Sequence, residues 1–371
     1  MVVPFGTGLQ LVTQSALSYM MPMKVLFLSA WYPTPRDAMA GLFVHKHAQA
    51  VREQGVDVRV LYNEEKGWDW WKTMYRDWRA LRDNGWKPDV VQVNVLDKNG
   101  IVAWLLWWLK DIPYVIVEHW SGYLAENGQF MQQPGWKKLL MRFVSRHARM
   151  ILPVSERLQA AMQACGIENK RWERIDNVVD DRFYEIATVR KADQPKRLLH
   201  VSCFDEASKN VKGLLRATRA LLEQRKDVTM SLIGTGRDWD DVRQYADTLD
   251  FPQGVLEWKG EQTPEQVCKA MHEHDALVLF SNYETYGIVL AEAMAAGLPS
   301  ISTKSCGLEV PEACGIRVEA GDEQQLTKAM KKRVEHPWPL TREKMQSYAS
   351  AFRAETIGAR LKQLYEQVIK G

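Results

Sequence analysis

The sequence has few of the residues that mark several common classes of protein. Its 371 residues include five cysteines, an odd number without a Cys-x-x-Cys pair, which argues against both a disulfide framework and a zinc site. No run of 18 or more apolar residues occurs, so no membrane-spanning helix is expected. The net charge of +3 is too small to imply nucleic acid by itself. These absences favour a protein of the reducing cytoplasm.

Charge is also absent from the start of the chain, because no charged residue precedes Lys24. A secretory signal would begin with basic residues and carry a longer apolar block. We therefore interpret residues 1–22 as a leader or a disordered extension, with the native start near Met21 or Met23.

What remains is typical of a two-domain α/β protein, because apolar runs alternate with amphipathic stretches. Buried strands are expected at 24–29, 56–62, 89–95, 114–117, 150–154, 197–202, 229–233, 256–260, 276–280 and 299–302. Helices are expected at 42–54, 67–84, 101–110, 136–149, 155–166, 211–224 and 345–369. The charged stretch around Pro195 predicts a boundary between a first domain (23–190) and a second domain (191–344), followed by a terminal helix (345–371).

The stretch from Leu279 to Thr303 carries two carboxylates at fixed places. Glu284 lies in the loop after a strand, and Glu292 lies within the next helix. The helix is expected to begin near Tyr286 or Gly287, so the amides of residues 286–288 would lack an intrahelical acceptor. Such a helix end favours anions, and a glycine lets a ligand approach the backbone closely. The stretch therefore predicts a sugar-nucleotide site.

A second candidate phosphate contact lies near the start of the first domain. Gly41 stands between the strand at 24–29 and the helix at 42–54, as in a first βα turn that approaches a phosphate. His45 and His47 follow on that helix, two positions apart and on different faces. We expect them to be solvated or capping residues and not metal ligands.

The string ETYGIVLAEAMAAGLP, from Glu284 to Pro299, resembles the motif of the retaining glycosyltransferases of family four. Their usual pattern is E-x-F-G-x-x-x-x-E-A-x-A-x-G-x-P, and Tyr286 here replaces the usual phenylalanine. The resemblance extends over residues 24–369. It implies the GT-B fold, in which two Rossmann-like, doubly wound parallel-sheet domains face a cleft and a C-terminal helix crosses back onto the first domain. It also implies a nucleoside diphosphate sugar donor, bound mainly by the second domain.

The resemblance suggests roles for particular residues around the donor. Glu292 would bind the ribose hydroxyls, and Glu284 would hold sugar hydroxyls. The amides of Tyr286, Gly287 and Ile288 would bind sugar or phosphate oxygens, and Gly41 would face the diphosphate and the acceptor. His119 matches a histidine that the family places near the donor sugar. Glu118, just before it, either orients His119 or faces solvent.

The family also places an arginine and a lysine on the donor diphosphate. Lys209 matches the lysine, but the arginine position falls on Cys203, unless the contact has moved to Lys212. Gly234 matches the glycine turn beneath the nucleotide, and Trp258 lies in the strand that resembles the base-binding one. A cation is needed here because the leaving diphosphate gains negative charge in the transition state.

No cofactor beyond the donor, and no metal, is expected. The string Asp238-Trp239-Asp240 resembles a metal-binding Asp-x-Asp, but it follows a glycine turn and is interpreted as surface-like. Enzymes that resemble this chain retain the anomeric configuration, and the usual implication is a front-face mechanism. The leaving diphosphate would then help to deprotonate the acceptor.

The expected acceptor is a glycan or a lipid-linked glycan of cell-surface polysaccharide synthesis. Eleven of the 15 tryptophans lie between Trp31 and Trp136, and the helix at 136–149 combines apolar residues with several Lys and Arg residues. That helix either packs with a solvated basic face or contacts an anionic membrane at its inner, cytoplasmic face.

Three alternatives stay open. One is a sugar-nucleotide epimerase of the same fold. A second is a phosphorylase-like enzyme, which would need a lysine-bound pyridoxal site that the sequence does not reveal. The third is a sugar-nucleotide-binding protein with weakened catalysis, which only the replacement of the arginine by Cys203 supports.

Overall fold

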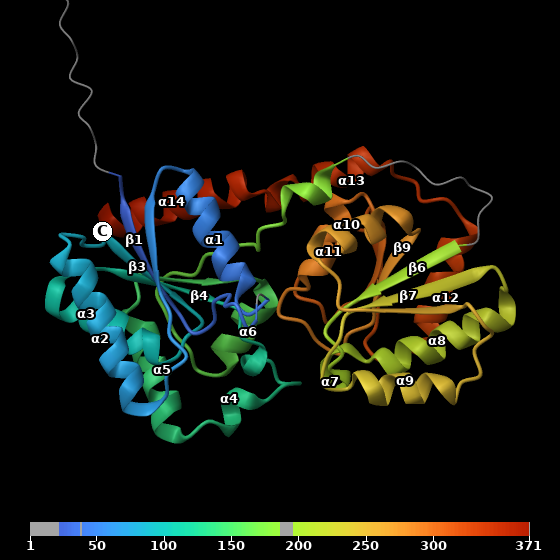
Figure 1. The fold of residues 1–371 in the computed structure, drawn as a ribbon, viewed down its shortest axis with the longest axis horizontal. Coiled ribbons are helices and arrows are strands. Elements are labelled where there is room, and N and C mark those ends of the chain that lie inside the picture. Colours follow the sequence, from blue (N-terminus) through green and yellow to red (C-terminus); the bar gives the residue numbers. More distant parts are fainter. Residues whose placement is uncertain (1–21, 38, 186–195, 371) are drawn as a thin grey trace, which may run out of the picture.

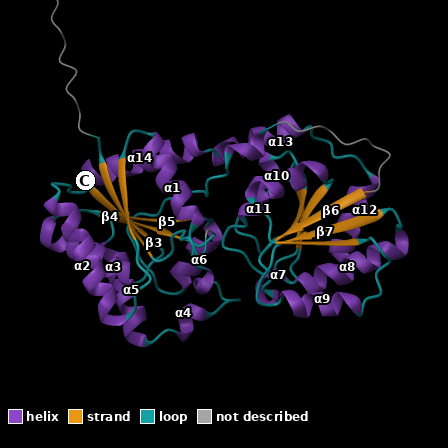
Figure 2. Cartoon of the chain, viewed as in Figure 1, coloured by secondary structure: helices purple, strands orange, loops and turns teal. Residues whose placement is uncertain are grey.

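The computed structural model describes residues 22–37, 39–185 and 196–370, which form two lobes, each built on a parallel β-sheet (Figures 1 and 2). In the first lobe the strand order is β2-β1-β3-β4-β5, and all neighbouring strands are parallel. These strands are β1 (Lys24–Ser29), β2 (Asp57–Leu61), β3 (Val90–Asn94), β4 (Tyr114–Glu118) and β5 (Met150–Pro153). Their nearly continuous apolar runs suit a sheet that is covered on both faces.

Helices cover both faces of this first sheet (Figure 2). Val25 and Phe27 pack in one hydrophobic cluster with α1, whereas Leu26 and Leu28 belong to the cluster that includes α2, α3 and α5. Successive side chains of a strand point to opposite faces, which explains this division. The helices of the lobe are α1 (Leu42–Glu53), α2 (Gly67–Asp83), α3 (Lys98–Lys110), α4 (Gln129–Gln132), α5 (Gly135–His147) and α6 (Glu156–Ala164).

The second lobe is a parallel sheet with the strand order β11-β10-β9-β6-β7-β8. Its strands are β6 (Lys196–Val201), β7 (Val228–Ile233), β8 (Leu256–Gly260), β9 (Ala276–Leu279), β10 (Ser300–Thr303) and β11 (Gly315–Val318). Its helices are α7 (Glu206–Lys209), α8 (Val211–Gln224), α9 (Trp239–Asp247), α10 (Pro264–Glu273), α11 (Ile288–Ala295) and α12 (Glu323–Glu335). The α/β architecture with two doubly wound sheets is therefore confirmed.

The terminal helix differs from the single helix expected at 345–369. It is divided into α13 (Arg342–Ala349), a short 3-10 turn and α14 (Ala354–Lys370). At the break, the carbonyl of Phe352 accepts a hydrogen bond from the amide of Val179, 2.9 Å away, and Arg353 is extended. Because the Phe352 carbonyl bonds to another segment, it does not continue the helical ladder.

The crossing back onto the first lobe is confirmed, since α14 lies along α1 (Figure 1). Gly358 allows a close approach, because a Cβ there would lie 2.2 Å from the carbonyl oxygen of Ala50. Farther along, the Tyr365 hydroxyl hydrogen-bonds Oε1 of Gln92 in β3, 2.5 Å away. The predicted leader and the predicted domain boundary near residue 190 lie outside the described residues, apart from Pro22.

Candidate active site

The candidate site begins where the strands of the two sheets end. In a parallel sheet all carboxyl ends share one edge, where open α/β folds bind their ligands. At this edge Ser155, in the loop after β5, donates a hydrogen bond from Oγ to the carbonyl of Thr285, 2.6 Å away. The loop between β9 and α11 therefore touches the first lobe directly.

Glu284 and Lys209 form an ion pair at this edge of the second sheet. The Lys209 ammonium lies 2.5 Å from Oε1 of Glu284, and each side chain is only 13% exposed. Ser281 also donates to Oε1 of Glu284, at 2.9 Å. Burial alone would lower the pKa of Lys209, but the adjacent Glu284 carboxylate outweighs it, so the net shift is upward. Lys209 is thus held as a cation inside the protein.

Backbone contacts fix the two partners of this pair. Lys209 is the last residue of the one-turn helix α7, and the amide of Asn282 donates to the carbonyl of Ser208, 2.8 Å away. The loop that carries Glu284 is thereby joined to the helix that carries Lys209. The family resemblance implied that both residues lie near the donor, but it did not predict that they contact each other.

The helix after Glu284 begins slightly later than the motif suggested. Its first residue is Ile288, and Gly287 is the N-cap with φ +87°, which favours glycine. The amide of Leu290 already donates to the Gly287 carbonyl. The first-turn amides are therefore those of Ile288 and Val289, and the amide of Tyr286 precedes the helix.

The side chain of Tyr286 does not face a ligand but joins the two lobes. It is buried, and its hydroxyl donates to Oδ1 of Asp176 in the first lobe, 3.2 Å away. The carbonyl of Asp176 is also hydrogen-bonded to Nε2 of His47, 3.0 Å away. The expectation that His47 is solvated or capping is wrong, because it is fully buried, and burial lowers its pKa to about 4. His45 instead contacts the Tyr32 hydroxyl through Nδ1, at 2.9 Å.

Glu292 faces the boundary between the lobes from α11. Burial raises its pKa to about 7, with Lys46 of α1 opposing the shift and Asp180 adding to it. Both of these charged neighbours precede the second lobe in sequence. Glu292 is therefore close to elements of the first lobe, and it is easily protonated near neutral pH.

His119 lies at the carboxyl end of β4, as expected, and is 8% exposed. Its ring centroid is 4.0 Å from that of Phe43 and 5.8 Å from that of His47. Burial, followed by the charge of His47, holds the pKa of His119 well below its ordinary value, so the ring is neutral. Its Nε2 is a buried atom with no hydrogen-bond partner among the described residues, and so it is available to a ligand.

Of the two alternatives drawn from the sequence for Glu118, exposure to solvent is wrong, since the side chain is fully buried. Its carboxylate accepts hydrogen bonds from the amides of Leu96, His119 and Trp120, each at 2.9 Å. Burial nevertheless raises its pKa to about 7. Glu118 thus positions the backbone of the loop that carries His119.

Two glycines of the predicted site are required by neighbouring backbone. A Cβ at Gly41 (φ +61°) would lie 2.3 Å from the carbonyl oxygen of Trp31. A Cβ at Gly234 (φ +123°) would lie 1.8 Å from the carbonyl oxygen of Ser202. Both glycines therefore let two loops pack at the carboxyl edges of their sheets.

Lys212 and Trp258, two other residues predicted to contact the donor, interact with residues outside the Lys209–Glu284 pair. The Lys212 ammonium pairs with Oδ2 of Asp241 in α9, 2.7 Å away, and not with Glu284. Trp258 packs edge-on against Trp239, with centroids 5.5 Å apart, and its ring is 6.2 Å from that of Phe204. Neither residue contacts the Lys209–Glu284 pair.

Arg237 is a cation at this edge that the motif comparison did not single out. It directly follows the glycine turn that starts at Gly234, and its guanidinium reaches Oδ1 of Asp205, 2.5 Å away, in the loop that leads to Lys209. Its position right after that turn was the only signal in the sequence. Asp238 stands at the N-cap position of α9, but its carboxylate accepts a hydrogen bond from the amide of Glu206 in another segment, so this Asp-x-Asp string lies at the start of a helix. Among the described residues, no group of three or more His, Cys, Asp or Glu side chains could hold a metal ion.

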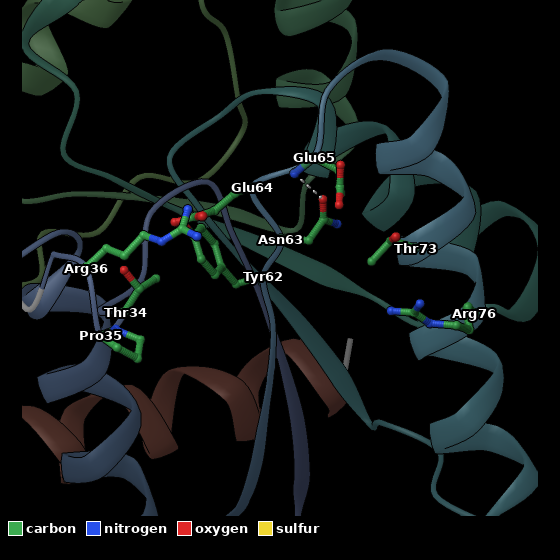
Figure 3. A pocket seen from close by; sticks show the side chains of 9 residues that line it. All are labelled: Thr34, Pro35, Arg36, Tyr62, Asn63, Glu64, Glu65, Thr73 and Arg76. Atoms are coloured by element: carbon green, nitrogen blue, oxygen red, sulfur yellow. Dashed lines mark hydrogen bonds between the residues drawn. The ribbon is translucent and has the colours of Figure 1, made fainter.

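A pocket of about 490 Å³ opens at the carboxyl edge of the first sheet (Figure 3). It is formed by the loop after β1, the segment after β2 and the outer side of α2. Its lining residues are Thr34, Pro35, Arg36, Tyr62, Asn63, Glu64, Glu65, Thr73 and Arg76. Charges of both signs and several hydroxyl groups make this pocket suited to a polar ligand.

Comparison with known proteins agrees with this arrangement. A family model described as "Glycosyl transferase 4-like domain" matches residues 25–177, and one described as "Glycosyl transferases group 1" matches residues 195–336. The chain is 26% identical over 247 residues to the N-acetyl-alpha-D-glucosaminyl L-malate synthase of Bacillus anthracis, which covers 62% of this chain and 63% of that protein. It is 27% identical over 154 residues to the lipopolysaccharide 1,6-galactosyltransferase of Salmonella typhimurium, which covers 41% and 42%.

The fold is also found among solved structures. The Anabaena protein HepE, crystallised with UDP-glucose, superposes with a TM-score of 0.72 at 17% identity, over 93% of this chain and all of that one. Among the described residues, no helix is long and apolar enough to cross a membrane. The two family models together span both lobes, and the chain therefore belongs to the family-four type of glycosyltransferases with the GT-B fold.

Proposed function

We propose that this protein is a retaining glycosyltransferase that moves a hexosyl group from a nucleoside diphosphate sugar to a glycan or a lipid-linked glycan. The observation that carries the proposal is the buried Lys209–Glu284 ion pair beside the amino end of α11. It supplies a fixed cation where a departing diphosphate would gain charge, together with a carboxylate that can accept hydrogen bonds from sugar hydroxyls.

In the proposed mechanism each lobe has its own part. Lys209 neutralises the diphosphate, Glu284 holds sugar hydroxyls and Glu292 binds the ribose. His119, neutral and with a free buried Nε2, contacts the far side of the sugar. The amides of Ile288 and Val289 add donors for phosphate or sugar oxygens.

The transfer itself is proposed to occur on one face of the sugar. The bond from the anomeric carbon to the diphosphate oxygen breaks, and the acceptor oxygen bonds to the same face of that carbon. The acceptor proton passes to the departing diphosphate, which leaves with the bonding electron pair. No resident metal takes part in this scheme, because Lys209 supplies the positive charge.

The acceptor is proposed to bind on the first lobe, in the pocket beside α2. Its mixture of hydroxyl, amide and charged groups suits a glycan with many hydroxyls. The names of two relatives mention different molecules, L-malate in one and lipopolysaccharide in the other. This difference agrees with the proposal that the first lobe selects the acceptor. A role in cell-surface polysaccharide synthesis is part of this proposal.

A thermal-shift screen of UDP, GDP and ADP sugars tests donor binding first. One donor class should raise the melting temperature, and nuclear magnetic resonance of the product should show the donor's anomeric configuration. Activity should survive EDTA. An inverted product would contradict retention, and an altered sugar nucleotide formed without acceptor would favour an epimerase. Donor binding without transfer or hydrolysis would favour the weakened binding protein.

A further inference from the structure

One side of the first lobe, formed by α3 and α5, exposes large apolar side chains. Trp108 is 65% exposed, Trp136 68% and Leu139 64%, and Phe143 is 41% exposed. We call these four residues, together with Trp104, the aromatic surface. Figure 1 shows α5 and the short α4 at the lower side of this lobe, with α4 toward the second lobe, and α3 at its left beside α2.

The aromatic surface is continuous across the two helices. Trp104 of α3 stacks on Trp108, with ring centroids 5.8 Å apart and an interplanar angle of 2°. Trp104 also meets Phe143 of α5 edge-on, with centroids 5.3 Å apart. Contiguous exposed apolar side chains of this kind mark an interaction site more often than single scattered ones do.

The exposed stripe of α5 is not the stripe that packs into the core. The buried residues of this helix are Met141, Val144 and Ser145. Trp136, Leu139 and Phe143 lie on another face at helical spacing. α5 therefore packs through one face, as one of the two interpretations of the sequence has it, but its solvent-exposed side carries large apolar residues as well as basic ones.

The charge of these helices is of one sign. Together α3 and α5 contain six Lys and Arg residues and no Asp or Glu: Lys98, Lys110, Lys137, Lys138, Arg142 and Arg146. Arg142 turns inward to the Cys165 carbonyl, and Arg146 pairs with Glu168. Neither Lys137 nor Lys138 forms an ion pair within the described part of the chain. The Lys138 ammonium hydrogen-bonds the Met131 carbonyl, and the Lys137 ammonium hydrogen-bonds Oε1 of Gln133 and also opposes the upward pKa shift of the buried Asp97.

The neighbouring helix α2 differs in this respect, although it also exposes Trp68 (73%) and Tyr75 (62%). Its cations pair with aspartates of the same helix, as Lys72 does with Asp69 and Arg79 with Asp83. Exposed aromatic residues therefore coincide on α3 and α5 with cations that have no carboxylate on the same helix, and this is not the case on α2.

We propose that the aromatic surface docks on an anionic lipid bilayer. Its rings would enter the headgroup region, while Lys110, Lys137 and Lys138 approach anionic headgroups. The charge of α3 and α5 favours such a bilayer over a neutral one. The segment from His119 leads through α4 directly into α5, so docking would bring a lipid-linked acceptor close to the first lobe's part of the site.

Co-sedimentation of the full chain with vesicles tests this directly. The protein should pellet with phosphatidylglycerol–phosphatidylcholine vesicles at low salt, and less so with pure phosphatidylcholine or at high salt. The triple variant Trp108→Ala/Trp136→Ala/Phe143→Ala should lose at least about tenfold in partitioning. The matched control Trp68→Ala/Tyr75→Ala on α2 should bind as the unchanged protein does, and melting curves would verify that both variants fold.

Charge is tested in the same assay. The variant Lys110→Glu/Lys138→Glu should weaken binding to anionic vesicles by at least about tenfold, since each cation contributes near an anionic surface. Its control, Lys328→Glu/Lys331→Glu on α12, changes the net charge equally on another element and should have little effect. The proposal would be overturned by no binding at low salt, by unchanged binding of the triple variant or by equal binding to neutral vesicles.

A second copy of the chain is the competing occupant of the aromatic surface. Light scattering that shows a dimer in the unchanged protein and a monomer in the triple variant, without vesicle binding, would assign the surface to self-association and overturn the proposal. None of these measurements needs a donor. The lipid proposal can therefore fail while the transferase proposal stands, and the reverse is also possible.

Discussion

The two lobes share one architecture, but the side chains that they place at the edge where they meet differ in charge. The second lobe contributes a buried ion pair, Lys209 with Glu284, and an exposed guanidinium, Arg237. The first lobe contributes a neutral histidine, His119, on a loop that the buried carboxyl of Glu118 holds. Charged groups of the second lobe thus lie where a diphosphate would bind, and the neutral imidazole of His119 lies where the donor sugar would bind.

The largest expected effect comes from removing the cation of the second lobe. Lys209→Ala should cost about 2–4 kcal/mol in kcat/KM, because the departing diphosphate loses a preorganised positive charge. Steady-state kinetics with the identified donor would measure it. Lys212→Ala is the matched control, since that lysine pairs with Asp241 in α9, and it should change kcat/KM by less than about threefold. Full activity of Lys209→Ala would contradict the division between the lobes.

A second test compares one carboxyl from each lobe, the fully buried Glu118 and the partly exposed Glu292. The pKa values of Glu118 and Glu292 are both raised to about 7 from an ordinary value of 4.5. The folded state therefore keeps these protons while the unfolded chain loses them. Their stabilising contribution is fully present below pH 4.5 and is lost as the pH rises to about 7, by about 3 kcal/mol for Glu118 and by less for the partly exposed Glu292.

Glutamine cannot ionise, so each variant should lose this pH dependence. The melting temperature of Glu292→Gln, relative to the unchanged protein, should rise between pH 5 and about 7 and then level off. The relative melting temperature of Glu118→Gln should follow the same trend but be lower at every pH. The reason is that one of the three hydrogen bonds from backbone amides would be weakened or lost. A difference that stays constant with pH would show that these carboxyls are not protonated in the folded protein.

A smaller effect is expected at the exposed cation of the second lobe. Arg237→Ala should weaken donor binding by about three- to tenfold, because its guanidinium lies beside the loop that leads to Lys209 but remains in solvent. Titration calorimetry at low and high salt would measure the change, and the difference should shrink as salt increases. Arg243→Ala, on the outer side of α9 near Trp239, is the control. Equal losses for both variants would mean that Arg237 has no particular role in donor binding.

The smallest expected effect concerns a contact between the lobes. Tyr286→Phe introduces the residue that the family usually has and removes the hydrogen bond to Asp176, at a cost of about 0.5–1.5 kcal/mol in unfolding free energy. Denaturant unfolding would measure it. Tyr245→Phe removes a hydroxyl that Arg216 contacts within the second lobe, and it should cost less because that contact is exposed. A larger loss of unfolding free energy for Tyr245→Phe than for Tyr286→Phe would contradict this prediction.

Most elements could be predicted from the sequence because their signals are local. The strand at Lys24–Ser29 and the helix at Val211–Gln224 occur where apolar patterning placed them. The divided terminal helix was not predictable in this way. At its break, Phe352 accepts a hydrogen bond from Val179, a residue more than 170 positions away. Hydrophobic periodicity gives no information about such a long-range contact.

For the site, the sequence by itself placed Glu284, Lys209 and His119 at the carboxyl edges of the two sheets, because a motif and the end of a strand are local properties of the chain. Only the tertiary structure decided what those residues touch. It paired Lys209 with Glu284 and turned Lys212 toward Asp241. It buried Glu118 against backbone amides and left Trp136 on the outside. These outcomes depend on contacts between segments far apart in the chain, and on burial, which sets both the charge of a group and its exposure.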